Sequence, residues 1–328
     1  MTDHLKMSRR VFLASGGALA LGTTGLLPEA ALALPDPDIA GYIDIPEGKL
    51  WYRINGAAHL GGPKAPLLCL HGGPGGNSRS MISLLALADE RAVIFYDQLN
   101  GGKSTWSDDK STWTVEHYLG EIPQVRAALG LDRVILVGHS MGTGWSVQYT
   151  AEMAPDGVEA LILGSPYLST ADWIEDAKLY REDLPAEVRE VLEAKEATDT
   201  YDDDYWAASS VYSDRHYCIA PCEVGDMAND APPFNGALYD YVWGPSDVKV
   251  SGTLKDYDVT PLLAKIEQPT LVFSGSADAA SPATAKRYAE RLPNGEFVVI
   301  PDAGHNVYQE QPEAVVTAVR GFLEAQNL

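Results

Sequence analysis

The sequence of this 328-residue chain predicts an α/β fold in which a mostly parallel sheet is covered by helices on both faces. Two observations lead to this fold class. Short, continuously apolar runs alternate with longer segments of helical periodicity, as is typical of parallel sheets. The alternation is interrupted once, over residues 168–262, by a segment that is too long for a loop and has no strand periodicity. We therefore expect residues 34–167 and 263–328 to form the core, with residues 168–262 as a helical cap inserted after the sixth strand.

The first two strands should pair with each other. Residues 41–46 and 49–56 alternate apolar and polar side chains and are joined at Glu47-Gly48, which predicts an antiparallel pair. Six runs follow that are apolar throughout, as expected for strands covered on both faces. They are residues 65–72, 91–98, 133–140, 158–166, 269–278 and 296–305.

Helical periodicity with suitable ends marks the segments between these strands. The predicted helices of the core are residues 114–130, 141–155, 282–293 and 311–326. Within the cap, residues 172–184 and 185–197 carry the same pattern. The acidic run Asp202-Asp203-Asp204 that follows them is interpreted as a solvated loop.

The chain is strongly acidic, with a formal net charge of −22 at pH 7. Such a chain is repelled by the phosphates of nucleic acids and by anionic lipids, so we exclude both as partners. A hydrophobic fraction of 45% with 21% charged residues is typical of a globular protein. The charge is therefore interpreted mainly as a well-solvated surface, with attraction of cationic ligands as a second interpretation.

The first 33 residues resemble an export signal. Arg9 and Arg10 precede a short apolar stretch rich in Ala and Gly, and the residues Ala-Leu-Ala at 31–33 form a small-residue cleavage site. An arginine pair in this place resembles the twin-arginine signal. We expect cleavage near Leu34, export from the cytoplasm, and no stable membrane insertion afterwards; an uncleaved anchor is the alternative.

The three cysteines give little sign of metal binding. Cys69 lies within an apolar run and is expected to be a small buried hydrophobe. Cys218 and Cys222 are close enough in sequence to form a disulfide in an oxidising compartment, although two free thiols remain open. His216 lies beside them, but the ligands are too few for zinc spacing. We expect neither a metal nor another cofactor.

The pattern G-x-S-x-G stands between an apolar run and a predicted helix. Its glycines, Gly138 and Gly142, allow a sharp turn that exposes the hydroxyl of Ser140 at the edge of the sheet. A nucleophilic serine needs a base, and the base needs a carboxylate that orients it. In this context the order along the chain is serine, acid, histidine.

Two histidines, His216 and His305, follow the serine in the sequence. His305 follows the last predicted strand, where a loop can reach the serine, whereas His216 lies in the cap and is interpreted as structural. Asp278 ends the preceding strand and is the predicted acid. Asp302 is a rival for that role, but it lies three residues from His305 and is expected to shape the loop. The predicted triad is Ser140, Asp278 and His305.

The glycine-rich run His71-Gly72-Gly73-Pro74-Gly75-Gly76 follows the third predicted strand. Acyl transfer places negative charge on a carbonyl oxygen, and its hydrogen-bond donors must be in place beforehand. Bare backbone can aim an N–H at that oxygen where a side chain would obstruct it. We predict that the N–H groups of Gly73 and Met141 form this oxyanion hole.

Together these residues resemble the α/β-hydrolase family. "HGGPGG" after the third strand, "YDQLNGGKS" after the fourth and "GTLKDYDVTP" at the end of the cap resemble proline iminopeptidases and related amino-acid amidases over essentially the whole mature chain. The resemblance implies an α/β-hydrolase fold and removal of an N-terminal residue, often proline, from small peptides or amides. It departs from the family's pattern where Met141 and Thr143 follow the serine.

The resemblance also implies that carboxylates of the cap hold the free ammonium of the substrate and that a nonpolar pocket takes its ring. In "WGPSDV", Asp247 stands where the family carries a longer glutamate. Glu223 and Asp214 are further candidates for the ammonium, and Trp243 is a candidate floor of the pocket or a core residue of the cap. An unpaired ammonium in a capped site is costly, so a carboxylate partner is needed.

We expect a serine hydrolase that releases an N-terminal proline or other small apolar residue from a small peptide or amide. Two alternatives use the same fold. The first is an ester or lactone hydrolase with the same triad. The second is a catalytically inactive binding protein, against which the order of the triad and the glycine-rich loop both argue.

Overall fold

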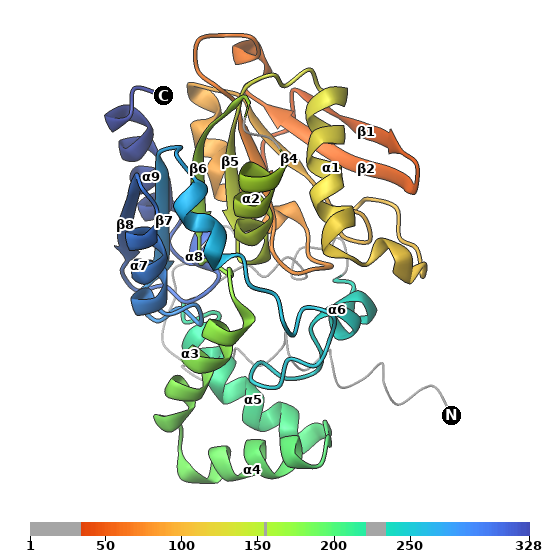
Figure 1. Ribbon diagram of the computed structural model, residues 1–328, viewed down its shortest axis with the longest axis vertical. Helices are drawn as coiled ribbons and strands as arrows, with labels where there is room; N and C mark the ends of the chain where they lie inside the picture. The colour runs from red at the N-terminus through yellow and green to blue at the C-terminus, as the bar shows by residue number, and fades with distance from the viewer. Residues whose placement is uncertain (1–33, 154–155, 221–233) are drawn as a thin grey trace, which may run out of the picture.

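The computed structural model describes residues 34–153, 156–220 and 234–328 (Figure 1). Within these residues the strands form one eight-stranded sheet with the order β1-β2-β4-β3-β5-β6-β7-β8. The strands are β1 Ile39–Ile45, β2 Gly48–Asn55, β3 Leu67–Leu70, β4 Val93–Tyr96, β5 Val134–His139, β6 Val158–Gly164, β7 Thr270–Gly275 and β8 Gly295–Ile300.

The pairing of the strands confirms the predicted sheet. β1 and β2 form an antiparallel hairpin that closes at the pair Ile45 and Gly48. β2 is antiparallel to β4, and every pairing from β4 through β3, β5, β6 and β7 to β8 is parallel. Parallel strands all end at the same edge of the sheet, so the segments that follow β3, β5, β7 and β8 gather there.

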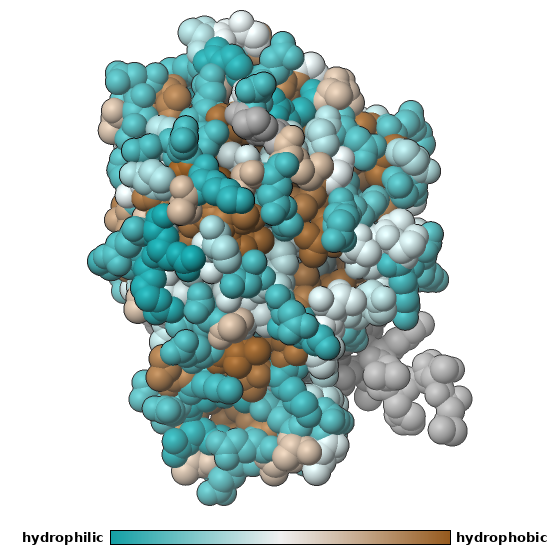
Figure 2. All heavy atoms as spheres, in the orientation of Figure 1, coloured by the Kyte–Doolittle hydropathy of each residue, from teal (hydrophilic) through white to brown (hydrophobic). Residues whose placement is uncertain are grey.

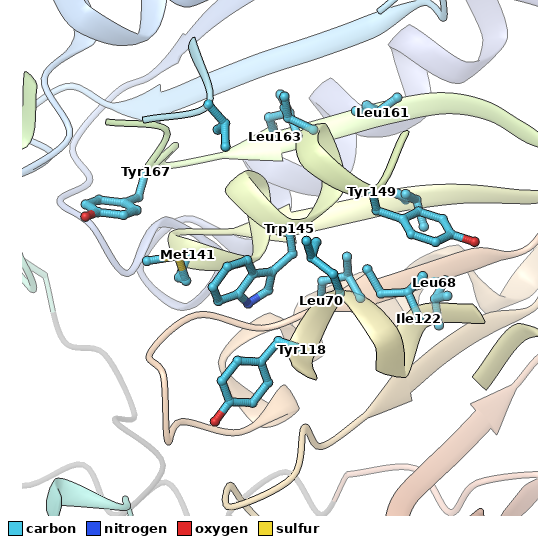
Figure 3. Close-up of a cluster of buried hydrophobic side chains, with 14 of the residues drawn as sticks. Leu68, Leu70, Tyr118, Ile122, Met141, Trp145, Tyr149, Leu161, Leu163 and Tyr167 are labelled. Atoms are coloured by element: carbon cyan, nitrogen blue, oxygen red, sulfur yellow. The ribbon is translucent and has the colours of Figure 1, made fainter. Parts of the chain in front are cut away.

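Helices cover both faces of the sheet (Figure 1). One face packs against α1, α2 and α7, and the other against the 3₁₀ helix η3 and α9. Figure 3 shows part of the first cluster, in which Leu68 and Leu70 of β3 lie near Ile122 of α1 and Trp145 of α2. The bounds are α1 Val115–Ala128, α2 Met141–Glu152, α7 Pro282–Arg291, α8 Val307–Glu310, α9 Pro312–Ala325 and η3 Ser78–Asp89; shorter 3₁₀ turns are η2 Ala57–His59, η4 Lys110–Thr112 and η5 Thr260–Lys265.

Four helices lie between β6 and β7 in the sequence and stand at the lower end of the sheet in Figure 1. They are α3 Thr170–Glu182, α4 Ala186–Ala197, α5 Asp203–His216 and α6 Gly236–Val242. The first three share a small apolar cluster of their own that includes Leu184, Leu192 and Tyr205. The insertion after the sixth strand is therefore helical, as the sequence predicted for the cap.

Two local predictions are wrong. β8 is not covered on both faces, because it is an edge strand paired with β7 alone, and Val298 and Val299 are 37% and 42% exposed. The acidic run is not a loop: Asp202 accepts a hydrogen bond from the N–H of Tyr205 as the N-cap of α5, and Asp203 and Asp204 begin that helix. Acidic side chains are favourable at a helix amino end, where N–H groups are unpaired.

The face of the molecule in Figure 2 carries mostly hydrophilic residues over both the sheet-bearing part and the cap. Among the described residues, no helix combines the length and the hydropathy that crossing a bilayer requires.

Candidate active site

Ser140 lies in a tight turn between β5 and α2. Its backbone angles, φ 53° and ψ −123°, place it in a region that residues other than glycine rarely adopt. The flanking glycines make the turn possible. A Cβ on Gly138 would lie 2.6 Å from the carbonyl oxygen of Gly142, and a Cβ on Gly142 would lie 2.0 Å from that of Leu70. The sequence therefore presents the hydroxyl of Ser140, which is only partly buried, at the carboxyl edge of the sheet.

The structure brings the three predicted triad residues together. His305 Nε2 lies 3.0 Å from Ser140 Oγ, and His305 Nδ1 lies 2.7 Å from Asp278 Oδ1. Asp278 is fully buried and also accepts hydrogen bonds from the N–H groups of Ala280 (2.8 Å) and Gly275 (3.2 Å). The carboxylate therefore selects the tautomer with hydrogen on Nδ1, which leaves Nε2 free to accept the serine proton.

The two residues weighed against the triad lie elsewhere. Asp302 is exposed and has a positive φ of 52°, and its backbone hydrogen-bonds to Ser276 and Gln311, whereas the ring nitrogens of His305 lie against Asp278 and Ser140. His216 supports the site through its backbone: its carbonyl oxygen accepts hydrogen bonds from the N–H groups of His305 (2.8 Å) and Ala279 (3.1 Å). Burial lowers the pKa of His216, whose Nδ1 lies 2.9 Å from the carbonyl oxygen of Ala277. Its structural interpretation holds, with a direct link to the triad that the sequence did not reveal.

The glycine-rich run lies against the serine. A Cβ on Gly72 would lie 2.8 Å from Ser140 Cβ, so no larger residue fits without displacing the serine. Gly73 has a φ of 123°, and a Cβ there would lie 2.7 Å from the N–H nitrogen of Gly76. On the other side of the serine, Met141 is the first residue of α2, and the first N–H groups of a helix have no partner within it. Of the two predicted oxyanion donors, Met141 directly follows the serine, and Gly73 directly follows Gly72, which lies against it.

His71 and Gln98 support this loop, and the sequence analysis did not assign either of them a role. The N–H of Gln98 donates to His71 Nε2 (3.0 Å), so Nδ1 carries the hydrogen and donates to the carbonyl oxygen of Gly72 (2.7 Å). Burial lowers the pKa of His71, which keeps the ring neutral. A second neutral histidine, His139, has its pKa lowered to about 3 by burial and by the charge of His305. The signal for His71 and Gln98 was present in "HGGPGG" and "YDQ", but their contact is a tertiary one.

Aromatic side chains of the cap surround the ring of His305. The rings of Trp173 and Tyr217 lie 5.2 Å and 5.4 Å from it, between centroids, and Trp243 lies 5.7 Å from Trp173. The hydroxyl of Tyr217 donates to Asp247 Oδ1 (2.9 Å), which places that carboxylate beside the aromatic group. Burial raises the pKa of Asp247, although the hydrogen bond from Tyr217 and the charge of Arg181 oppose this.

The other predicted substrate-binding residues have different outcomes. Asp214 is exposed on α5. Glu223 lies outside the described residues, as does Cys222, on which the predicted disulfide to Cys218 depends. Trp243 is 4% exposed and packs against Tyr167 as well as Trp173, so it is both part of the cap's packing and near the site. In the part of the chain that the structure describes, no three His, Cys, Asp or Glu side chains are grouped to hold a metal ion.

Comparison with known proteins agrees with this geometry. Residues 65–312 match the sequence pattern of the α/β hydrolase fold family. A proline iminopeptidase of Heyndrickxia coagulans is 34% identical over 287 residues, which cover 87% of this chain and 98% of that protein. The crystal structure of a proline iminopeptidase from Mycobacterium smegmatis is 30% identical with a TM-score of 0.77, covering 88% of this chain and 99% of its own.

A further solved structure, that of a protein called VinJ, has a TM-score of 0.80 at 29% identity and covers 88% of this chain and 99% of its own. The similarity thus extends through the core and the cap alike. The chain belongs to the α/β-hydrolase family, within the branch that contains the proline iminopeptidases.

Proposed function

We propose that this protein is a serine hydrolase in which Ser140 attacks the carbonyl carbon of the substrate. The observation that carries the proposal is the unbroken series of hydrogen bonds from Asp278 through His305 to Ser140 Oγ. His305 Nε2 takes the serine proton as the acyl-enzyme forms and returns it to the leaving group, while Asp278 stabilises the protonated ring. Water, deprotonated by His305, then attacks the acyl-enzyme, and Ser140 leaves with the proton, which frees the acyl product. The N–H groups of Gly73 and Met141 receive the oxyanion. A binding protein would have no use for this arrangement.

The proposed reaction is release of an N-terminal residue, proline or another small apolar residue, from a small peptide or amide. Relatives that this chain matches over nearly their whole length are named proline iminopeptidases. The position of Asp247 supports a free amine on the substrate, because its carboxylate lies within the cap beside the aromatic rings next to His305. The apolar surface of Trp173 and Trp243 suits a small ring.

A panel of arylamides of proline, alanine and leucine, assayed beside simple acyl esters, tests the substrate class. We expect the free-amine arylamides, with proline foremost, to have the highest kcat/KM. Preference for esters or lactones would support the alternative hydrolase instead. A phosphonylating probe for active-site serines should label Ser140 and leave Ser140→Ala unlabelled. Absence of an adduct on the folded protein would contradict serine catalysis.

We further propose that the protein works outside the cytoplasm. The support is the arginine pair Arg9-Arg10, the short apolar stretch after it and the small residues at 31–33, all of which lie outside the described residues.

A further inference from the structure

The segment that leaves cap helix α5, residues 216–220, contacts both of the loops that carry Asp278 and His305. We call it the clasp segment. The carbonyl oxygen of His216 accepts hydrogen bonds from the N–H groups of His305 and Ala279. The carbonyl oxygen of Tyr217 accepts a hydrogen bond from the N–H group of Asn306 (2.9 Å). The approach is close, since a Cβ on Gly304 would lie 2.8 Å from the carbonyl oxygen of His216. The backbone on either side of His305 is thus held by the cap.

Glu310, at the end of α8, joins the clasp segment to the loop of His305. Its Oε1 accepts hydrogen bonds from the N–H groups of Ile219 (2.6 Å) and Ala220 (3.0 Å), and its Oε2 accepts from that of Gly304 (2.9 Å). Glu310 is only 7% exposed, and burial raises its pKa while the three backbone hydrogen bonds oppose that rise. Each of the three N–H groups needs an acceptor oxygen, and the ionised carboxylate of Glu310 offers acceptors only.

Through these contacts the buried carboxylate of Glu310, which is not part of the triad, is connected to the position of His305. Gly304 precedes His305 directly, and Ile219 follows shortly after Tyr217, whose ring contacts His305 and whose hydroxyl holds Asp247. A shift of Glu310 would therefore move the backbone next to His305, and with it the Nε2 atom. It would also move Tyr217, which holds Asp247. A misplacement of about 1 Å can lower a rate about 100-fold.

We propose that Glu310 is a positioning residue that holds the clasp segment against the loop of His305, so that docking of the cap and formation of the triad geometry depend on each other. The proposal rests on the proposed role of His305. It assigns Glu310 no contact with the substrate. The substrate amine and the acyl group remain with the residues named above.

The test is Glu310→Gln, assayed on a proline arylamide and on a neutral acyl ester. Glutamine keeps the length of the side chain, but it replaces one acceptor oxygen by an N–H₂ group that must face a backbone N–H in either orientation. We expect kcat to fall about 10- to 100-fold on both substrates, with KM changed less than threefold. The active fraction is counted by the end point of serine phosphonylation, so that loss of folded protein is not mistaken for a lower kcat.

A matched control separates positioning from stability. Glu90→Gln removes a half-buried carboxylate that accepts from Lys64 Nζ (2.6 Å) just before β4, at the edge of the sheet opposite to the triad. We expect it to lower Tm while kcat is retained. If Glu310→Gln behaves in the same way, with a lower Tm and an unchanged kcat, Glu310 is a structural residue and the proposal is overturned.

A second variant covers failure of the first to fold. Gly304→Ala keeps the carboxylate and pushes on the clasp segment from the other side, since its Cβ would meet the carbonyl oxygen of His216. It should also lower kcat with little change in KM, and full activity in a folded Gly304→Ala variant would overturn the proposal. If the unaltered protein itself neither hydrolyses the substrates nor reacts with the phosphonate, the proposed function has failed, a result distinct from an active enzyme that tolerates both substitutions.

Discussion

At the scale of single residues, the site combines a charged triad with a second carboxylate that lies in the cap. Asp278 faces His305, whereas Asp247 faces the cap aromatics through the hydroxyl of Tyr217. The two carboxylates therefore have separate tasks in the proposed reaction. Asp278 stabilises a charge that develops during catalysis, and Asp247 pairs with a charge that the substrate brings with it.

Asp247→Asn should separate these tasks. Loss of a charge-assisted hydrogen bond to the substrate ammonium costs about 1.5–3 kcal/mol, so kcat/KM for a proline arylamide should fall about 10- to 100-fold. Hydrolysis of a neutral acyl ester should barely change, because the asparagine oxygen can still accept from Tyr217. Asp214→Asn, on the exposed side of α5, is the matched control and should leave both rates intact. Equal losses on both substrates would mean that Asp247 supports the fold.

At the scale of elements, the loops after β3, β4 and β5 support one another. The glycine-rich loop after β3 lies against Ser140, and the backbone of Gln98 after β4 holds the ring of His71 at the start of that loop. Glu121 of α1 in turn accepts a hydrogen bond from the N–H of Leu99 (3.0 Å). The loops after β3 and β5 are short, and contacts with neighbouring segments position all three loops. The site is therefore built on rigid elements.

Gly72→Ala tests the contact between the glycine-rich loop and the serine. The added methyl carbon would lie 2.8 Å from Ser140 Cβ, so the loop or the serine has to move. We expect kcat to fall about 100-fold, since a shift of about 1 Å suffices for such a loss. Gly120→Ala in α1 is the control, because nothing lies within 4 Å of its Cβ position, and it should be as active and slightly more stable. A normal kcat for Gly72→Ala would contradict this account, because it would mean that the loop accommodates a methyl group without moving Ser140.

The buried carboxylate of α1 should make stability depend on pH. Burial raises the pKa of Glu121, so the folded state binds its proton more tightly than the unfolded state does. Its ionisation therefore lowers the free energy of unfolding as the pH rises from the ordinary glutamate pKa through the raised one. Glu121→Gln should raise Tm at pH 8 and change it little at pH 4, as measured by calorimetry. Glu193→Gln, exposed on α4, should shift Tm equally at both pH values, and a similar result for Glu121→Gln would contradict this account.

At the scale of the whole molecule, an apolar interior on both faces of the sheet is joined to a cap with its own small core. Parallel strands that are distant in sequence form slowly, because the chain has to close long loops before they pair. The proposed export fits this architecture, because a twin-arginine signal carries proteins that have already folded.

Replacement of Arg9 and Arg10 by lysine should therefore retain the protein in the cytoplasm. The measurement is the distribution of hydrolase activity between the cytoplasmic and exported fractions of the producing cells. A control variant in which Lys6 is replaced by arginine keeps the charge and the arginine pair, and it should be exported normally. Unchanged export of the double lysine variant would mean that another route is used.

The sequence by itself determined the order of the strands and of the long core helices, the turn at Ser140 and the three residues of the predicted triad. These features carry local signals: apolar periodicity, paired glycines around a serine, and an acid and a histidine that each follow a strand. Once the strands are parallel, their carboxyl ends meet, so residues far apart in the chain are placed together without knowledge of side-chain contacts.

The tertiary structure alone decided the support of the site and the exposure of its edges. Glu310, Tyr217 and Trp173 reach the loop of His305 from helices and loops that have no motif of their own. β8 has an apolar run like those of the central strands, yet its exposure depends on its place at the edge of the sheet. The packing of distant segments decides which strands are neighbours in a sheet and which donors surround a buried carboxylate. The local periodicity of the sequence contains no information about that packing.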